Sequence, residues 1–137
     1  LKVAGGEGLS MKQDEIPLAR HAIEFRINAE DPENDFFPQP GEVTTVELPG
    51  GPGVRVDTAI FEGYEVPPFY DSLVGKLIVW GADRHEAIAR GRRALGEYRL
   101  EGIKTTVPLH LRLLDDEAFL SGEYDTGYLE RLLDEES

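Results

Sequence analysis

The stretch HAIEFRINAEDP, residues 21–32, alternates between apolar and polar side chains. Its apolar members are Ile23, Phe25 and Ile27. Its polar members are Glu24, Arg26, Asn28 and Glu30. Because successive side chains of a strand point to opposite faces, the pattern predicts a strand with one buried and one polar face. Arg26 then lies among acids and an amide on the polar face. It either balances their charge in solvent or has a catalytic or binding role.

Three further segments have strand character, and prolines and glycines separate them. They are residues 42–48, 54–60 and 73–80. The last of these, LVGKLIVW, is almost wholly apolar and is expected to be buried, with Lys76 as its single charge. Between the last two segments, the pair Pro67-Pro68 excludes residues 66–70 from a central strand position.

Helical signals follow the last strand. Asp83 and Glu86 have the spacing of a capping box, and apolar residues then recur on one helical face as far as Tyr98. Gly102 is expected to end this unit. N-caps predict three more helices; the capping residues are Thr106, Asp115 or Asp116, and Thr126. Since the strands precede the helices, the sequence predicts an α+β fold, a mostly antiparallel sheet followed by flanking helices.

Length and composition bound the class of protein. The chain has 137 residues, of which 40% are hydrophobic and 30% are charged, so residues 1–137 fit a single globular domain. Cysteine is absent, which excludes a disulfide framework and a thiolate metal site. No apolar run approaches the roughly 20 residues that span a bilayer, and the N-terminus lacks a signal-peptide pattern. We therefore expect a cytoplasmic protein without membrane contact.

The charge balance is strongly acidic. Lys and Arg number 14 against 27 Asp and Glu, which gives a net charge of −13. This balance argues against nucleic-acid binding, which needs clustered bases. The acids are scattered, and this favours general solvation, including adaptation to high salt, over attraction or repulsion of one partner.

No complete catalytic set follows from the residues alone. The histidines have no metal-binding spacing, the serines lie in no nucleophile elbow, and the glycine clusters lack the context of a phosphate loop. The acids of residues 31–35 begin like a calcium loop, but Phe36 occupies the position where that loop needs glycine. No metal site is expected. Three charged residues stand out by their place in the pattern: Arg26 on its polar strand face, Arg55 just after a Gly-Pro-Gly turn, and Asp71 after PPFY.

A series of motifs along the chain resembles a known family. The motifs are HAIEFRINAEDP, FFPQPG, PGGPGVRVD, GYEVPPFYDSLVGKLIVWG and RRALGEYRLEGIKTT. Together they resemble the C-terminal domain of biotin carboxylase, the component of acetyl-CoA, propionyl-CoA and pyruvate carboxylases that depends on ATP and bicarbonate. The N-terminal and ATP-grasp domains of that family are absent from this chain. LKVAGG at the start reads like the last turn of a helix, which agrees with a segment of a longer protein.

The resemblance implies a role for Arg26. In the family the matching arginine lies in the active site, where bicarbonate is first phosphorylated by ATP and the ureido oxygen of biotin becomes anionic. Arg26 is therefore expected to stabilise that anion as a catalytic residue. Glu24 and Asn28, two residues away on the same face, are expected to support its guanidinium. The alternative is a solvent-facing arginine that only balances Glu24 and Glu30.

The resemblance also implies binding surfaces. Arg55 and Asp71 match positions at or near the family's homodimer interface, although Pro52 replaces an aromatic residue that bacterial relatives often have there. Thr126 matches a position that touches the adenine edge of ATP.

The implied function is ATP- and bicarbonate-dependent carboxylation of biotin on a carrier protein. Biotin, ATP and magnesium are the expected cofactors, held mainly by domains outside this chain, and the chain alone is expected to be inactive. Expected partners are a biotin carboxyl carrier domain, a carboxyltransferase, bicarbonate and a second copy in a homodimer. The alternative is a dimerisation or interaction module that kept this fold without catalysis. The upstream reading frame distinguishes the two.

Overall fold

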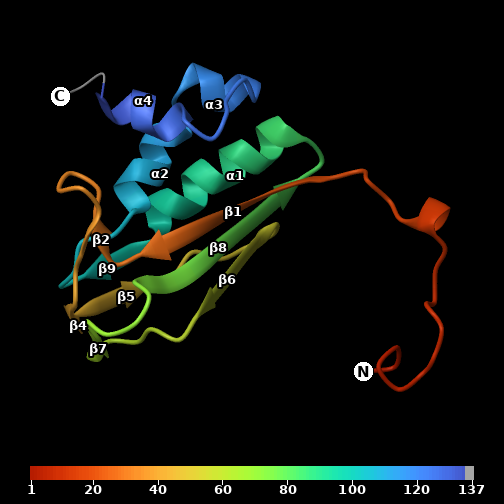
Figure 1. Cartoon of the computed structure of the whole chain (residues 1–137), viewed down its shortest axis with the longest axis horizontal. Coiled ribbons are helices and arrows are strands. Elements are labelled where there is room, and N and C mark those ends of the chain that lie inside the picture. Colours follow the sequence, from red (N-terminus) through yellow and green to blue (C-terminus); the bar gives the residue numbers. More distant parts are fainter. Residues whose placement is uncertain (135–137) are drawn as a thin grey trace.

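The structure is a computed structural model that describes residues 1–134, and it combines antiparallel strands with helices (Figure 1). The strands are β1 (His21–Asn28), β2 (Glu30–Asp31), β3 (Phe37–Pro38), β4 (Gly41–Val43), β5 (Thr45–Glu47), β6 (Val54–Thr58), β7 (Tyr64–Val66), β8 (Leu73–Gly81) and β9 (Arg99–Glu101). The helices are η1 (Gln13–Glu15), α1 (Arg84–Glu97), α2 (Val107–Leu113), α3 (Glu117–Ser121) and α4 (Tyr128–Asp134). The α+β prediction is confirmed.

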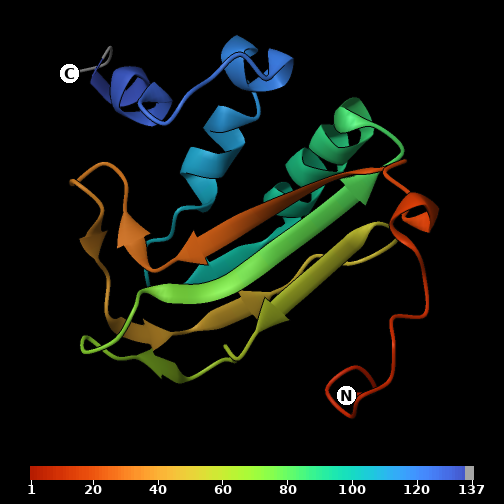
Figure 2. The same cartoon turned by 45° about the vertical axis from the view of Figure 1, so that its right-hand side comes forward.

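The central sheet has three strands in the order β1-β8-β6, and both pairings are antiparallel. The long α1 runs along one face of this sheet, and α2, α3 and α4 gather beyond one edge (Figure 2). The N-terminal residues 1–20 extend away from this body in both views. The opening segment LKVAGG forms a single turn, in which the Gly5 N–H donates to the carbonyl of Leu1 over 2.8 Å.

The alternation of residues 21–28 builds one side of the core. Phe25 and Ile27 of β1 pack with Leu77 of β8 and with Leu95 of α1 in one buried cluster. Each such side chain contributes roughly 1.5–3 kcal/mol through its burial. Gly91 lets α1 approach β1 closely, because a Cβ atom there would lie 2.9 Å from the Phe25 ring. The predicted buried face of this strand is confirmed, as is the burial of β8.

The start of α1 follows its predicted cap with one difference. The Asp83 carboxylate accepts a hydrogen bond from the Glu86 N–H over 2.9 Å. The Glu86 carboxylate, however, accepts from Ala82 N–H, one residue before the position that a reciprocal capping box requires. The capping box prediction is therefore right for Asp83 and wrong for its return bond.

Two predicted boundaries are wrong for tertiary reasons. Residues 42–48 form two short strands, since the chain breaks at Thr44, whose N–H donates to the carbonyl of Glu101. β4 pairs with β7, whereas β5 pairs with β9. The unit that begins with α1 was expected to continue to Gly102, yet α1 ends at Glu97 and residues 99–101 form β9. The partner strand β5 supplies hydrogen bonds that override the local helical pattern.

The C-terminal helices begin mostly as expected. The Asp116 carboxylate accepts from the N–H groups of Ala118 and Phe119, and α3 stops at Gly122, whose φ is 84°. The cap predicted at Thr126 is displaced, because Gly127 directly precedes α4 and its N–H donates to the Asp125 carboxylate. Among the described residues, no helix combines the length and the apolar character needed to cross a membrane.

Candidate functional site

Arg26 lies on the polar face of β1, and half of its side chain is exposed. Its direct cross-strand neighbour on β8 is Lys76. Like charges in this position destabilise a sheet unless anions lie close by. Lys76 turns toward Glu24, with 3.5 Å between its Nζ and the carboxylate, so Arg26 is left to find another partner.

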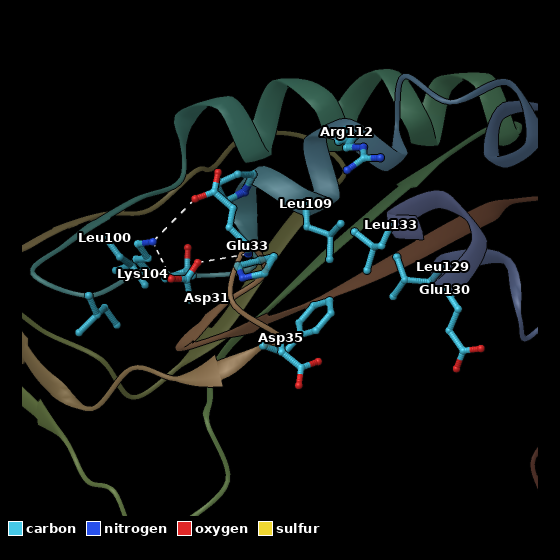
Figure 3. Close-up of a pocket in the computed structure, with 15 residues that line it drawn as sticks. Asp31, Glu33, Asp35, Leu100, Lys104, Leu109, Arg112, Leu129, Glu130 and Leu133 are labelled. Atoms are coloured by element: carbon cyan, nitrogen blue, oxygen red, sulfur yellow. Dashed lines mark hydrogen bonds and ion pairs between the residues drawn. The ribbon is translucent and has the colours of Figure 1, made fainter. Parts of the chain in front are cut away.

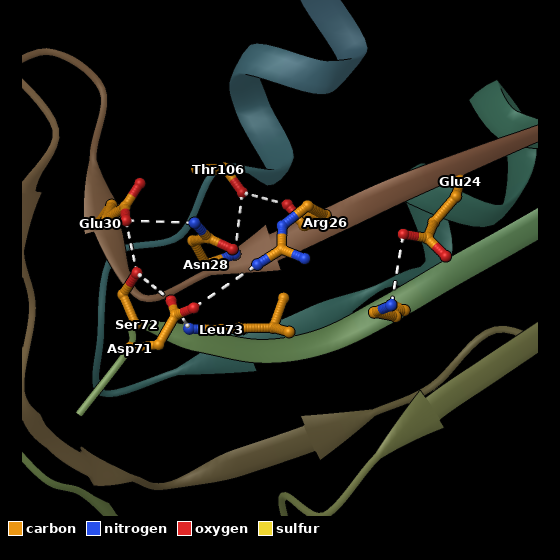
Figure 4. Close-up of polar contacts among 9 residues, drawn as sticks. Glu24, Arg26, Asn28, Glu30, Asp71, Ser72, Leu73 and Thr106 are labelled. Carbon is orange, nitrogen blue, oxygen red and sulfur yellow. Dashed lines mark hydrogen bonds and ion pairs between the residues drawn. The ribbon is translucent and has the colours of Figure 1, made fainter.

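That partner is Asp71, from the loop that precedes β8 (Figure 4). The Arg26 Nη2 lies 3.6 Å from the Asp71 Oδ2, and 69% of the Asp71 side chain is exposed. The other carboxylate oxygen of Asp71 accepts from the Leu73 N–H over 3.1 Å, which fixes the loop. An ion pair this long and this exposed contributes little free energy. The guanidinium is therefore oriented by Asp71 without being tightly bound.

Glu24 and Asn28 do not contact the guanidinium among the interactions of the described residues. Glu24 pairs with Lys76, and the Asn28 Nδ2 donates to Glu30 over 3.1 Å. Asp71 provides the ion pair of Arg26, and the support that Glu24 and Asn28 are expected to give the guanidinium stays a prediction. The Asn28 Oδ1 is buried with no partner among the described atoms, and a buried polar atom in that state typically costs about 1–3 kcal/mol.

The backbone of Arg26 is held by α2 and its N-cap. The Thr106 hydroxyl accepts from the Asn28 N–H and donates to the Arg26 carbonyl, each over 3.0 Å. The His110 Nε2 donates to the same carbonyl over 2.8 Å. Burial lowers the pKa of His110, and the hydrogen bond to the Arg26 carbonyl partly offsets this. Thr106 was predicted only as a helix cap, but its hydroxyl makes no bond within α2.

Arg55 lies on β6, on the other side of β8, and its charge is matched locally. Its Nε donates to the Asp57 Oδ1 over 2.8 Å, and its Nη2 lies 2.8 Å from the Oδ2. This hydrogen bonding raises the pKa of Arg55 and lowers the pKa of Asp57. Arg55 and Asp71 therefore occupy different surroundings, and only Asp71 joins Arg26.

A groove between the β2–β3 turn, α2 and α4 lies apart from Arg26 (Figure 3). Leu109, Leu129 and Leu133 form its apolar wall. At its other end, the Lys104 Nζ lies 2.6 Å from the Asp31 carboxylate, which raises the pKa of Lys104. Thr126 is exposed on the turn before α4 and is not among the residues that line the groove.

The described residues contain no group of three or more acids and histidines placed to hold a metal ion. In particular, the loop acid Asp31 is engaged by Lys104.

Comparisons with known proteins agree with one another. The family model described as the biotin carboxylase C-terminal domain matches residues 24–131. Biotin carboxylase 1 of Bacillus subtilis is 53% identical over 130 residues, which cover 95% of this chain and 29% of the relative. The biotin carboxylase of Pseudomonas aeruginosa is 53% identical over 133 residues, which cover 97% of this chain and 29% of that protein.

Solved structures show the same match. The biotin carboxylase domain of a thermophilic 2-oxoglutarate carboxylase bound to bicarbonate has a TM-score of 0.92 and 44% identity; the match covers 95% of this chain and 29% of that one. The biotin carboxylase domain dimer of Hydrogenobacter thermophilus 2-oxoglutarate carboxylase, in complex with MgADP, ADP and bicarbonate, gives the same values. The chain thus spans less than a third of these relatives' length.

Proposed function

The chain belongs to the biotin carboxylase C-terminal domain family, and from this premise we propose that it contributes Arg26 to the active site of a biotin-dependent carboxylase. The observation that carries the proposal is the state of that side chain. Its side chain is half exposed, and its guanidinium makes a 3.6 Å ion pair as its contact among the described residues. Its backbone carbonyl accepts two side-chain hydrogen bonds. This is a cation held in place and still open to a ligand.

Carboxylation of biotin creates an anion that such a cation can stabilise. ATP phosphorylates bicarbonate, and the resulting carboxyphosphate breaks down to carbon dioxide and phosphate. The phosphate takes the ureido N–H proton of biotin, which leaves negative charge on the ureido oxygen, and the nitrogen then attacks the carbon dioxide. A fixed guanidinium aimed at that oxygen stabilises the transition state more than the neutral ground state. Arginine suits the position because it stays charged and presents a planar fork of donors.

Asp71 sets the resting orientation of Arg26 in this proposal. The long ion pair keeps the guanidinium on the polar face, and the arriving substrate oxygen replaces or joins the carboxylate. Glu24 keeps the neighbouring Lys76 away, so that two cations do not crowd the same point. The supporting role expected of Glu24 is thus indirect.

The remaining substrates are proposed to bind mostly outside the described residues. One solved relative carries bicarbonate and another carries MgADP with bicarbonate, which supports ATP and bicarbonate as substrates. No group of three or more acids and histidines among the described residues is placed to hold a metal ion, so none of them is proposed to act through magnesium. Thr126 remains a proposed contact for adenine, and its exposure before α4 leaves the hydroxyl accessible.

The proposed partners are a biotin carboxyl carrier domain, which delivers biotin, and a carboxyltransferase, which receives carboxybiotin. A homodimer is proposed with Arg55 at its interface, supported by a dimer among the solved relatives. Asp71 keeps its proposed place near that interface while it also contacts Arg26.

A chimera tests the proposed function. This chain replaces the matching segment of the Bacillus subtilis relative, to which it is 53% identical, and ATP hydrolysis that depends on both biotin and bicarbonate is measured. The chimera is expected to be active. The relative truncated before the segment, and this chain alone, are expected to be inactive.

Two outcomes oppose the proposal. A folded chimera without biotin-dependent turnover means that the chain does not complete the site, and a stable dimer of the chain alone would then favour the interaction module. Turnover by the isolated chain means that the other domains are not needed.

A further inference from the structure

The outer edge of β1 meets α2 next to Arg26, and this contact carries an inference that rests on the proposed function. We propose that Thr106 and His110 are positioning residues, which fix the backbone from which the Arg26 guanidinium projects. Both side chains donate to the Arg26 carbonyl, so both act through the backbone of that residue (Figure 4 shows the contact of Thr106).

Thr106 is fastened to β1 by three hydrogen bonds. Its hydroxyl accepts from the Asn28 N–H and donates to the Arg26 carbonyl, and its own N–H donates to the Asn28 carbonyl over 3.1 Å. The residue is 5% exposed, so water does not compete for these groups. A hydroxyl has a single proton, and the two contacts fix its direction. Thr106 thus spans the peptide groups on the C-terminal side of Arg26.

His110 adds a second donor to the same carbonyl. A carbonyl oxygen only accepts, so the His110 Nε2 must carry the proton in the 2.8 Å contact. The imidazole packs against the Phe25 ring, with 5.5 Å between their centroids, which holds it in position. The Arg26 carbonyl therefore accepts from two side chains of the α2 region at once.

Sheet pairing alone does not fix this part of β1. The strand is at the edge of the three-stranded sheet, and its register with β8 shifts between Ile27 and Asn28. Edge backbone groups need partners, and here α2 supplies them instead of another strand. Because a displacement of about 1 Å can cost roughly 10²-fold in rate, this anchoring affects catalysis without contact to the substrate.

The test uses the carboxylase chimera and a matched pair of threonines. Thr58 also accepts from a backbone N–H, that of Ile60, and donates to a backbone carbonyl, that of Val74, but it does not touch Arg26. Thr106→Val is expected to lower kcat about 10- to 100-fold with the KM for ATP within about twofold. Thr58→Val is expected to leave kcat within about twofold, and Thr106→Ser to restore it to within about threefold.

A pair of substitutions at His110 tests the same contact without removing the side chain. His110→Gln keeps an N–H donor and is expected to retain kcat within about threefold, whereas His110→Leu is expected to lose about tenfold. Equal losses in Thr106→Val and Thr58→Val, or no difference between the Gln and Leu variants of His110, overturn the inference.

A readout without turnover separates this inference from the proposed function. In the chain alone, amide hydrogen exchange of Asn28 is expected to quicken at least about tenfold in Thr106→Val compared with Thr58→Val. Unchanged exchange contradicts the anchoring, whether or not the chimera is active. Quickened exchange with an inactive unmodified chimera supports the anchoring and contradicts only the proposed function.

Discussion

Two arginines flank the central strand β8, and the sheet holds them in opposite ways. Arg26 on β1 has a loose 3.6 Å ion pair at its head and a backbone carbonyl fixed by two side chains of the α2 region. Arg55 on β6 has a close two-point pair with Asp57, two residues along its own strand. Both side chains are at least half exposed.

The difference indicates which of the two arginines is better able to bind a substrate anion. A guanidinium already bound at two points has little to gain from a substrate anion, because it must first give up its carboxylate. When a guanidinium projects from a fixed backbone and has only a weak partner, little free energy is lost in ordering it for a substrate anion. Exposure and charge are similar at the two positions, so the strength of the ion pair and the side-chain anchoring of the backbone carbonyl distinguish them.

The largest effect is expected from a change in β8, the strand between the two arginines. Leu77 is fully buried and lies opposite Phe25 on one side and Val56 on the other. Leu77→Ala is expected to lower the free energy of unfolding by about 2–5 kcal/mol, since it removes contacts to both flanking strands and leaves a cavity. Urea unfolding of the 137-residue chain measures this. A loss below about 1 kcal/mol would mean that β8 does not bind the two strands into one core.

The turn before Arg55 gives a smaller effect confined to the β6 side. Gly53 has a φ of 74°, and a Cβ atom there would lie 2.7 Å from the Trp80 carbonyl. Gly53→Ala is expected to destabilise the chain by more than about 1 kcal/mol, because alanine is strained at positive φ. Hydrogen exchange should quicken at Val54 and leave Asn28 unchanged. Equal acceleration at both positions would show that the two flanks are not independent.

The β1 side carries a pH dependence in the range where histidine titrates. An unperturbed histidine has a pKa of 6.5, and burial lowers the pKa of His110 in the folded chain. The unfolded state then binds more protons below about pH 6.5, so the stability that neutral His110 contributes is lost as pH falls toward its folded pKa. The stability difference between the wild-type chain and His110→Gln is expected to shrink from pH 7 to pH 5.5. A constant difference across this range would contradict the assigned burial effect.

The smallest effect is expected for Arg55 itself. Arg55→Ala removes an exposed ion pair on the sheet surface, so the urea midpoint of the chain is expected to stay within experimental error. The same variant in the carboxylase chimera is expected to weaken self-association, as measured by sedimentation across a dilution series. Unweakened association would remove Arg55 from the proposed interface.

The sequence predicts those parts of this protein that depend on local pattern. The alternation around Phe25 requires the period of a strand, and that period alone is enough to place Arg26 on the polar face. The Asp116 cap and the Gly122 stop are likewise local. The role proposed for Arg26, by contrast, rests on resemblance to a family, because polar-face geometry alone permits an exposed ion pair equally well.

The missed features depend on contacts between distant segments. Asp71 reaches Arg26 only because β8 pairs antiparallel to β1 and brings its preceding loop to the end of that strand. Thr106 has the sequence context of a helix cap, but its hydroxyl forms hydrogen bonds with the edge of β1 instead of with α2. Three-residue β9 is a strand only because β5 lies beside it. No local signal in the sequence identifies these partners.

The comparison of the two arginines leads to one decisive measurement. In the carboxylase chimera, kcat for biotin carboxylation is determined for Arg26→Ala and Arg55→Ala at saturating ATP, bicarbonate and biotin. Arg26→Ala is expected to lower kcat about 10²- to 10³-fold with the KM for ATP nearly unchanged, and Arg55→Ala to leave kcat within about threefold. Equal effects of the two variants, or an Arg26→Ala defect confined to the KM for ATP, would contradict the assignment of Arg26 to the developing anion.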